Sequence, residues 1–160
     1  MNKNGFSLVE LVVVLAILGI LMSIVTLDFN AYTRKAQIER QTRELFADIN
    51  QARIDSLHRK TRHSIVLEPN SYSFKRYSSE NENQSDGTVL QTRNVSYEIT
   101  IENGTSISTV VTEFDIRGFT NNLGTFRINP VGTTAQVDCI IIATGRTNLG
   151  KMENGSCVYK

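Results

Sequence analysis

The feature that most constrains this chain is an uncharged run of 17 residues, Leu11 to Leu27, close to the N-terminus. With residues 6–9 in front of it, the apolar segment is about long enough to cross a bilayer as a helix. A single carboxylate, Glu10, interrupts it. An ionised side chain at mid-helix costs roughly 2.5–3.5 kcal/mol on insertion scales, and less near an end. The pattern therefore predicts a cationic partner for Glu10.

Two ordinary interpretations of this segment are a cleaved secretory signal and a plain membrane anchor. A secretory signal has a positive start, an apolar core of about 7–15 residues and a small-x-small cleavage site. Lys3 supplies the positive start, but the apolar run is longer and no Ala-x-Ala follows it. A plain anchor accounts for the apolar length, but it accounts neither for Glu10 nor for the Gly5-Phe6 junction behind a leader of only five residues.

The first eleven residues, MNKNGFSLVEL, resemble the class III signal of type IV pilins and type II secretion pseudopilins. The resemblance implies that a prepilin peptidase in the membrane cuts after Gly5 and N-methylates Phe6. It also implies that Glu10 pairs with the N-terminal amine of a neighbouring subunit, which would be the missing cation. In a low-dielectric filament core such a pair would set the axial register, because only one stagger brings the two charges together.

From Asn30 to about Lys60 the sequence has the pattern of an amphipathic helix. Neither proline interrupts the path from Phe6 to Lys60, so we expect one helix of roughly 80 Å. Pilins often carry a proline late in the apolar half; Leu27 occupies that neighbourhood here, and Gly19 is the remaining weak point. The apolar positions are Ala31, Ile38, Leu45, Ile49 and Ala52, and the charged ones, expected to be a solvated face, are Arg34, Lys35, Glu39, Arg40, Arg43 and Glu44.

After the helix the sequence changes to short strand-like runs separated by turn residues. The spacing favours antiparallel sheets over βαβ units. The polar segment 78–87 is expected to be a solvated loop, and Asn103-Gly104 is a hairpin signal. The expected strands are Ser64–Glu68, Ser71–Tyr77, Val95–Glu102, Val110–Asp115, Gly124–Asn129, Val137–Ala143 and a last short strand that contains Cys157-Val158-Tyr159.

A second resemblance covers this half of the chain. The runs Phe114–Gly118, Thr125–Ile128 and Ile140–Arg146, with Ala52-Arg53, are similar to the C-terminal domain of the GspH/FimT group (FimU-like), which contains minor pilins and a minor pseudopilin. The two resemblances together imply an α+β, pilin-like fold: a long N-terminal helix, transmembrane in its first half, packed on an antiparallel β-sheet head. The expected boundaries are a leader at 1–5, an apolar assembly helix at 6–28, an amphipathic helix at 29–61 and the head at 64–160.

The two cysteines, Cys139 and Cys157, lie beyond the apolar segment. The short N-terminal flank with Lys3 is expected to face the cytoplasm, which places the cysteines on the exported side, where disulfides persist. A bridge would close a loop of about 19 residues and contribute roughly 3 kcal/mol on the chain-entropy estimate, joining the last strand to the one before it. A free thiol pair and a metal site are the alternatives, although two cysteines without clustered histidines are too few for zinc. His58 and His63 are expected to be exposed.

No nucleophile elbow, phosphate loop or His-Glu metal motif is present in the sequence, so an enzyme is the least expected class, and no cofactor or metal is implied. The resemblance implies partners of another kind: other pilin or pseudopilin subunits, the prepilin peptidase, an inner-membrane assembly platform and the membrane itself. It implies a single pass through the bacterial inner membrane with a periplasmic head, in a pilus or a secretion pseudopilus.

DNA binding is the main alternative function. Some FimT-like pilins bind DNA in natural transformation through a Gly-Arg-x-Arg motif in the last loop. Here the matching residues are 145–148, Gly-Arg-Thr-Asn, and the second arginine is missing. Phosphate affinity grows with the number of contacts, so Arg146 and Lys151 predict weak binding at most. A turn glycine followed by a surface arginine is the favoured interpretation of Gly145-Arg146.

Overall fold

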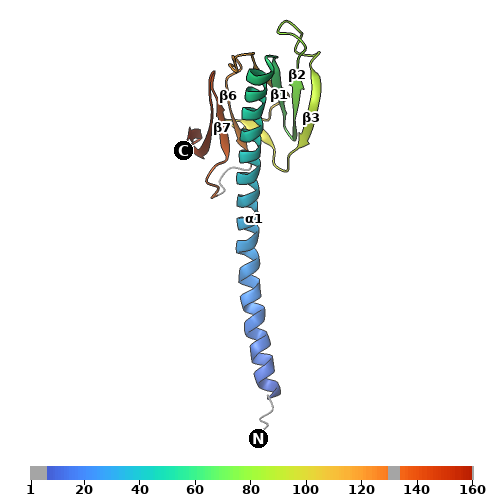
Figure 1. The fold of residues 1–160 in the computed structure, drawn as a ribbon. Coiled ribbons are helices and arrows are strands. Elements are labelled where there is room, and N and C mark those ends of the chain that lie inside the picture. Colours follow the sequence, from blue (N-terminus) through green and yellow to red (C-terminus); the bar gives the residue numbers. More distant parts are fainter. Residues whose placement is uncertain (1–6, 130–133, 160) are drawn as a thin grey trace.

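The computed structural model describes residues 7–129 and 134–159, without the side chains of residues 23–28. One long helix, α1 (Leu8–Arg59), projects from a β-rich head (Figure 1). The α+β, pilin-like class predicted from the sequence is confirmed. The strands in the described part of the chain are β1 (His63–Glu68), β2 (Ser71–Arg76), β3 (Thr88–Asn94), β4 (Ile99–Ile101), β5 (Val110–Phe114), β6 (Gly124–Ile128), β7 (Cys139–Ile142), β8 (Thr147–Glu153) and β9 (Ser156–Tyr159).

The helix α1 is continuous over 52 residues, which at 1.5 Å per residue is about 78 Å. It passes through Gly19 and Leu27 without a break, as the lack of an internal proline predicts. Ser7 precedes it in extended geometry, with φ −74° and ψ 143°. At the other end Lys60 adopts the left-handed conformation, with φ 53°, which stops the helical hydrogen-bond pattern and turns the chain toward β1.

The strands form two antiparallel sheets that lie against the C-terminal half of α1. The first has the order β3-β2-β1-β5, and the second has the order β4-β6-β7-β8-β9. In Figure 1 strands β1, β2 and β3 of the first sheet lie on one side of α1, and strands β6 and β7 of the second lie on the other. The helix contacts β1 and β5 of the first sheet and β6, β7 and β8 of the second, so it joins the two sheets into one head.

Ala31, Ile38, Leu45 and Ala52 recur every seven residues on α1, but the head covers only the last three. Ala31 is exposed, whereas the next three positions of that pattern, Ile38, Leu45 and Ala52, are buried. Ala31 therefore lies on the predicted helix but outside the head, which ends before it along the helix axis. The core that covers the buried positions combines both sheets and includes Ile65, Leu67, Phe114, Phe126, Ile128, Ile140 and Ile142.

Two strands were missed and one was placed wrongly by the sequence pattern. β3 is exposed along its whole length and β8 has mixed polarity, so neither shows the alternation that marks a half-buried strand. The strand expected at Val95–Glu102 is reduced to the three residues of β4. Asn154-Gly155, a dipeptide typical of hairpin turns, marks the end of β8: both residues have positive φ, and they make the two-residue turn between β8 and β9.

His63 was also misjudged. His58 is exposed, as expected, but His63 opens β1 and only 2% of its surface is accessible. It pairs with Arg76 of β2 on one side and Phe114 of β5 on the other, and its Nδ1 lies 2.8 Å from the Thr61 carbonyl oxygen. A position between two neighbouring strands decides its burial, and a local sequence pattern does not carry that information.

Candidate functional site

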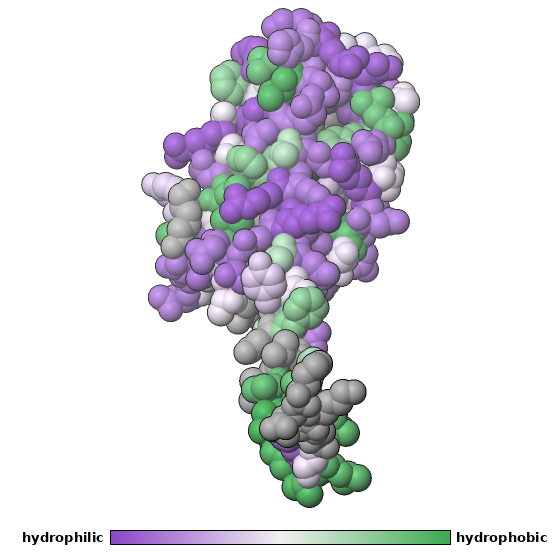
Figure 2. Space-filling model, turned by 60° about the horizontal axis from the view of Figure 1, so that its bottom comes forward, coloured by the Kyte–Doolittle hydropathy of each residue, from purple (hydrophilic) through white to green (hydrophobic). Residues whose placement is uncertain are grey.

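The first half of α1 is an uncovered apolar surface. From Leu8 to Met22 every large apolar side chain is about half exposed or more, with values from 47% to 78%. Figure 2 shows these hydrophobic side chains gathered on the projecting part of the helix, whereas the head is mostly hydrophilic. A helix that is apolar on all sides is normally buried in protein or lipid. This segment therefore needs a partner that the folded chain itself does not supply.

Glu10 lies on this surface, in the first turn of α1. Its side chain is exposed, and it forms no ion pair with any other described residue. A carboxylate in the first helical turn interacts favourably with the helix dipole, by roughly 0.3–1 kcal/mol at an exposed site. This is smaller than the roughly 2.5–3.5 kcal/mol that an ionised residue costs well inside a bilayer. The helix dipole alone thus does not offset the placement of Glu10 in an apolar environment, and the need for a cation remains.

Within the described residues, no part of α1 reaches both the length and the hydropathy of a membrane-crossing helix. The predicted cleavage after Gly5 and the predicted methylation of Phe6 both fall in residues 1–6, which are not among the residues that the structure describes.

In the head, Arg53 connects α1 with both sheets. It is 92% buried, and its guanidinium donates to the carbonyl oxygens of Gly118 (2.7 Å), Thr144 (3.1 Å) and Ala143 (3.3 Å). It also donates to the Thr147 hydroxyl at 3.3 Å. These acceptors belong to the β5–β6 loop and to the β7–β8 turn and the start of β8. One side chain therefore fixes the position of two loops relative to the end of the helix.

Arg53 achieves this without a carboxylate partner among the described residues. Its guanidinium lies 4.8 Å from the centre of the Phe114 ring, a cation–π distance. Burial lowers the pKa of Arg53 below its usual value, because desolvation disfavours the charged form. Gly118 makes the close approach feasible: it has φ +75°, and a Cβ there would come within 3.3 Å of the Arg53 side chain and 2.9 Å of Leu57.

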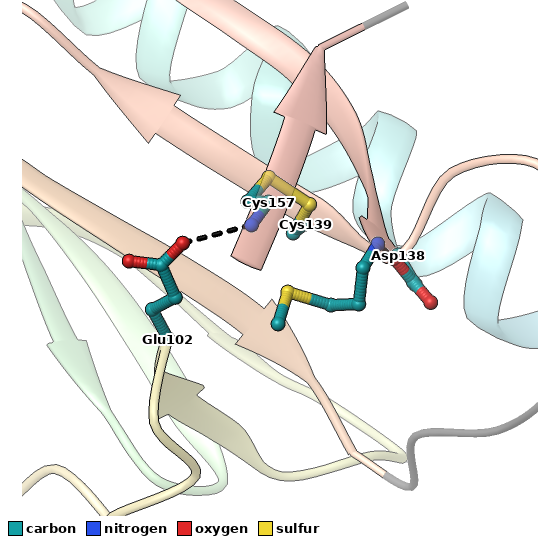
Figure 3. The surroundings of a disulfide bond; sticks show 5 residues. Glu102, Asp138, Cys139 and Cys157 are labelled. Carbon is teal, nitrogen blue, oxygen red and sulfur yellow. Dashed lines mark hydrogen bonds between the residues drawn. A yellow bond between two sulfur atoms is a disulfide. The ribbon is translucent and has the colours of Figure 1, made fainter. Parts of the chain in front are cut away.

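Cys139 and Cys157 form a disulfide, with the two Cα atoms 6.1 Å apart (Figure 3). Its route differs from the predicted one. The bridge does not connect the last strand to its predecessor, because β8 lies between the two bridged strands, β7 and β9. Gly150 of β8 passes beneath it: a Cβ at this position would lie 2.6 Å from the sulfur of Cys157 and 3.1 Å from that of Cys139. The bridge therefore requires glycine on the middle strand.

Two carboxylates hold the backbone around the bridge. Glu102 accepts a hydrogen bond of 2.8 Å from the Cys157 amide (Figure 3), and Asp138 accepts one of 2.7 Å from the Met152 amide. Asp138 is 98% buried, and desolvation raises its pKa above the usual value despite that hydrogen bond.

The two candidate DNA contacts do not form a patch. Arg146 is exposed in the β7–β8 turn, where the Ala143 amide donates to the Arg146 carbonyl oxygen at 2.9 Å. Lys151 lies five residues along and within β8, which corresponds to roughly 17 Å at 3.4 Å per residue. Two cations that far apart do not grip one phosphate. The geometry matches the favoured interpretation, a turn glycine with a surface arginine.

Metal binding has no assembled site in the part of the chain that the structure describes. No group of three or more His, Cys, Asp or Glu side chains there is arranged to hold an ion.

Comparison with protein families gives one match. Residues 1–26 match the model described as the prokaryotic N-terminal methylation motif, which is the prepilin signal of type IV pilin-like proteins. The match covers the leader and most of the apolar segment, and it contains Gly5, Phe6 and Glu10. Comparison of the chain with curated proteins and with solved structures found no match.

Proposed function

We propose that this chain is a minor pilin or pseudopilin of the GspH/FimT kind, a structural subunit that helps to initiate or cap a type IV pilus or a type II secretion pseudopilus. The observation that carries the proposal is the uncovered apolar half of α1, from Leu8 to Met22, in a chain whose first 26 residues carry the methylation motif. Such a surface has no use in an isolated soluble head. It suits a subunit that moves from the membrane into the core of a helical filament.

In this proposal the leader 1–5 is removed after Gly5 and the new N-terminal residue, Phe6, is methylated. The projecting half of α1 then packs against the same segment of neighbouring subunits. Because these side chains leave lipid and not water, they contribute through close van der Waals packing with neighbouring helices and not through hydrophobic transfer. Glu10 receives the N-terminal ammonium of a neighbour, which neutralises it and sets the stagger between subunits.

The topology that fits this role is a single pass through the bacterial inner membrane, with the head outside the cytoplasm. The disulfide between Cys139 and Cys157 supports this side, because disulfides persist in oxidising compartments such as the periplasm. The partners are other pilin-like subunits, the prepilin peptidase and the assembly platform.

The first test is intact mass and N-terminal sequencing of the protein from its own membranes and from sheared surface fibres. A chain that starts at methylated Phe6 is expected. Its presence in the fibres would identify a pilus subunit, and its restriction to the envelope would identify a pseudopilus or an initiation complex. A chain that still starts at Met1 would contradict the proposal and leave a plain anchor.

The second test is Glu10→Ala, with Glu44→Ala as the matched control, since Glu44 is an exposed glutamate on the same helix. We expect Glu10→Ala to leave cleavage and head folding unchanged and to lower incorporation into the assembly strongly. Glu44→Ala is expected to assemble normally. Normal incorporation of the Glu10→Ala protein would remove the role given to Glu10.

A further inference from the structure

A pocket of about 490 Å³ lies at the end of the head farthest from the N-terminal half of α1. The strand directions place it there. β1 starts beside the end of the helix, and β5 runs antiparallel to it, so that Phe114 returns to His63. The β5–β6 loop and the β7–β8 turn therefore meet at this distal end (Figure 1), where the Thr120 amide donates to the Thr144 carbonyl oxygen at 3.0 Å.

The walls of this distal pocket are held in place by hydrogen bonds within the head. One oxygen of Asp115 accepts from the backbone amides of Arg117 (2.9 Å) and Phe119 (2.8 Å), which closes the loop into a tight turn. Arg53 fixes the backbone of Gly118 and Thr144 from below. A pocket whose walls are set in advance loses little conformational entropy when a ligand binds, and its volume is in the range of small-molecule sites.

The charged residues that line the pocket cancel in pairs. Arg117 donates to the second Asp115 oxygen through two nitrogens, at 3.0 Å and 2.9 Å. Arg62 lies 3.5 Å from the Glu113 carboxylate and stacks over the Tyr77 ring, 3.9 Å from its centre. Two arginines and two carboxylates leave a net charge of zero among the lining residues. A phosphate or a carboxylate would therefore have to break an existing ion pair to obtain its own.

The groups that the pocket still offers are one aromatic ring and neutral hydrogen-bonding side chains. Phe119 lines it with 48% of its surface exposed, and the Arg117 guanidinium lies over one face of its ring, 5.8 Å from the centre. Asn121 is exposed in the same loop, and the Asn122 side-chain oxygen accepts only a long bond of 3.3 Å from the Glu113 amide. In the same wall Arg62 Nε and Glu113 Oε1 are buried without a hydrogen-bond partner among the described residues. These two atoms are closed off from solvent, so the hydrogen-bonding side chains open to a ligand are Asn121 and Asn122, in the same loop as the half-exposed Phe119 ring.

We propose that this distal pocket binds a neutral sugar, one hexose unit of a glycan, with its apolar ring face on Phe119 and its hydroxyl groups on the asparagine amides. A hexose has both parts that the pocket requires: a C–H face that packs on an aromatic ring, and hydroxyls that act as both donors and acceptors. The zero net charge of the lining selects against nucleotides and other anions. This role is separate from filament assembly and does not depend on Glu10.

The test uses the full-length chain in a detergent without a sugar headgroup. The probes are the methyl glycosides of glucose, galactose, mannose, N-acetylglucosamine and N-acetylgalactosamine, with glucose 6-phosphate and glucosamine as charged comparators. Binding is followed by saturation-transfer NMR and by titration. We expect at least one neutral glycoside to bind more tightly than either charged sugar. The affinity should not change between low and high salt, because no net charge is involved.

Phe119→Ala is the test variant, and Leu123→Ala is its matched control, since Leu123 is 61% exposed in the same loop but does not line the pocket. Phe119→Ala should weaken binding by at least about tenfold, which is about 1.4 kcal/mol. If it does not fold, Asn121→Ala replaces it. The proposal is overturned if no neutral glycoside binds, if glucose 6-phosphate binds best, or if the control weakens binding as much as the test variant.

Discussion

The two halves of α1 are one uninterrupted helix with opposite requirements. In the N-terminal half, Leu8 to Met22, apolar side chains point in every direction and remain exposed. In the C-terminal half, from Ile38 on, one face is buried against two sheets, and even its polar members have partners: the Thr42 hydroxyl donates to the Ile38 carbonyl oxygen at 2.8 Å. The difference shows that the head buries its apolar side chains within one chain. The apolar side chains of the projecting half can be buried only in an assembly or a membrane.

The largest loss of unfolding free energy is expected from Arg53→Met, which alters the head, the part whose core is formed within one chain. The substitution leaves the carbonyl oxygen of Gly118 without its donor and removes one of the two donors to the carbonyl oxygen of Thr144. A hydrogen bond from a charged donor contributes about 1.5–3 kcal/mol, and the variant loses all four that Arg53 makes. Urea unfolding of the full chain in detergent should show this loss, whereas Arg40→Met, at an exposed position of the same helix, should change little. An Arg53→Met head as stable as the original would mean that the two sheets do not need this junction.

The next largest effect is expected from removal of the disulfide, by reduction or by Cys139→Ser with Cys157→Ser. The sequence separation of 18 residues corresponds to a loss of about 3 kcal/mol on the chain-entropy estimate. Thermal unfolding with and without reductant measures it. The helical signal of the projecting half should persist, because the bridge lies wholly in the head. An unchanged melting temperature after reduction would show that the bridge carries none of the stability of the head.

Gly150→Ala tests whether the disulfide passes over β8. The added Cβ meets both sulfur atoms and the Val158 carbonyl oxygen, so overpacking should cost about 1–3 kcal/mol in the oxidised protein. After reduction the sulfur atoms are free to separate, and part of the cost should disappear. Gly155→Ala tests only the positive φ of the next turn and has no atom within 4 Å of its Cβ, so its cost should not depend on reduction. Equal costs of Gly150→Ala in both redox states would contradict the route of the bridge over β8.

A smaller effect is expected from Gly19→Ala in the projecting half. No atom lies within 4 Å of a Cβ at this position, so alanine fits, and its helix propensity is about 1 kcal/mol better than that of glycine. Amide hydrogen exchange around residue 19 should slow, while the unfolding midpoint of the head stays the same. A shift in that midpoint would show that the two halves of the helix are energetically coupled and would contradict their independence.

The smallest effect is expected from Asp138→Asn and appears as a change in pH dependence. Because burial raises the pKa of Asp138 in the folded state, the folded protein holds this proton more tightly than the unfolded chain. The contribution of Asp138 to stability is full below its ordinary pKa of about 3.8 and is lost as the pH rises through the raised folded-state pKa. The asparagine variant should therefore gain stability relative to the original across that window and keep the gain at neutral pH. A gain in stability that instead shrinks as the pH rises would mean that the pKa of Asp138 is lowered in the folded protein and not raised.

Sequence patterns predicted the parts of this protein that depend on local periodicity. The long helix, the strands β1, β2, β5, β6 and β7, and the turn at Gly145 all follow from spacing or turn chemistry. The patterns failed where burial depends on distant residues. β3 has no buried face, so no alternation marks it, and His63 is buried by strands that lie on both sides of it.

The sequence by itself determined that the two halves of the helix have different environments. An apolar segment whose single charge is a carboxylate near its start cannot be a water-exposed surface, whatever follows it. Only the tertiary structure decided how the head is held together. The donors and acceptors of the Arg53 junction are 65 to 94 residues apart in the chain, and the disulfide crosses a strand that no local pattern revealed. Helical period and charge are properties of neighbouring residues, whereas hydrogen-bond partners and strand order are set when distant segments compete to pack on the same face of α1.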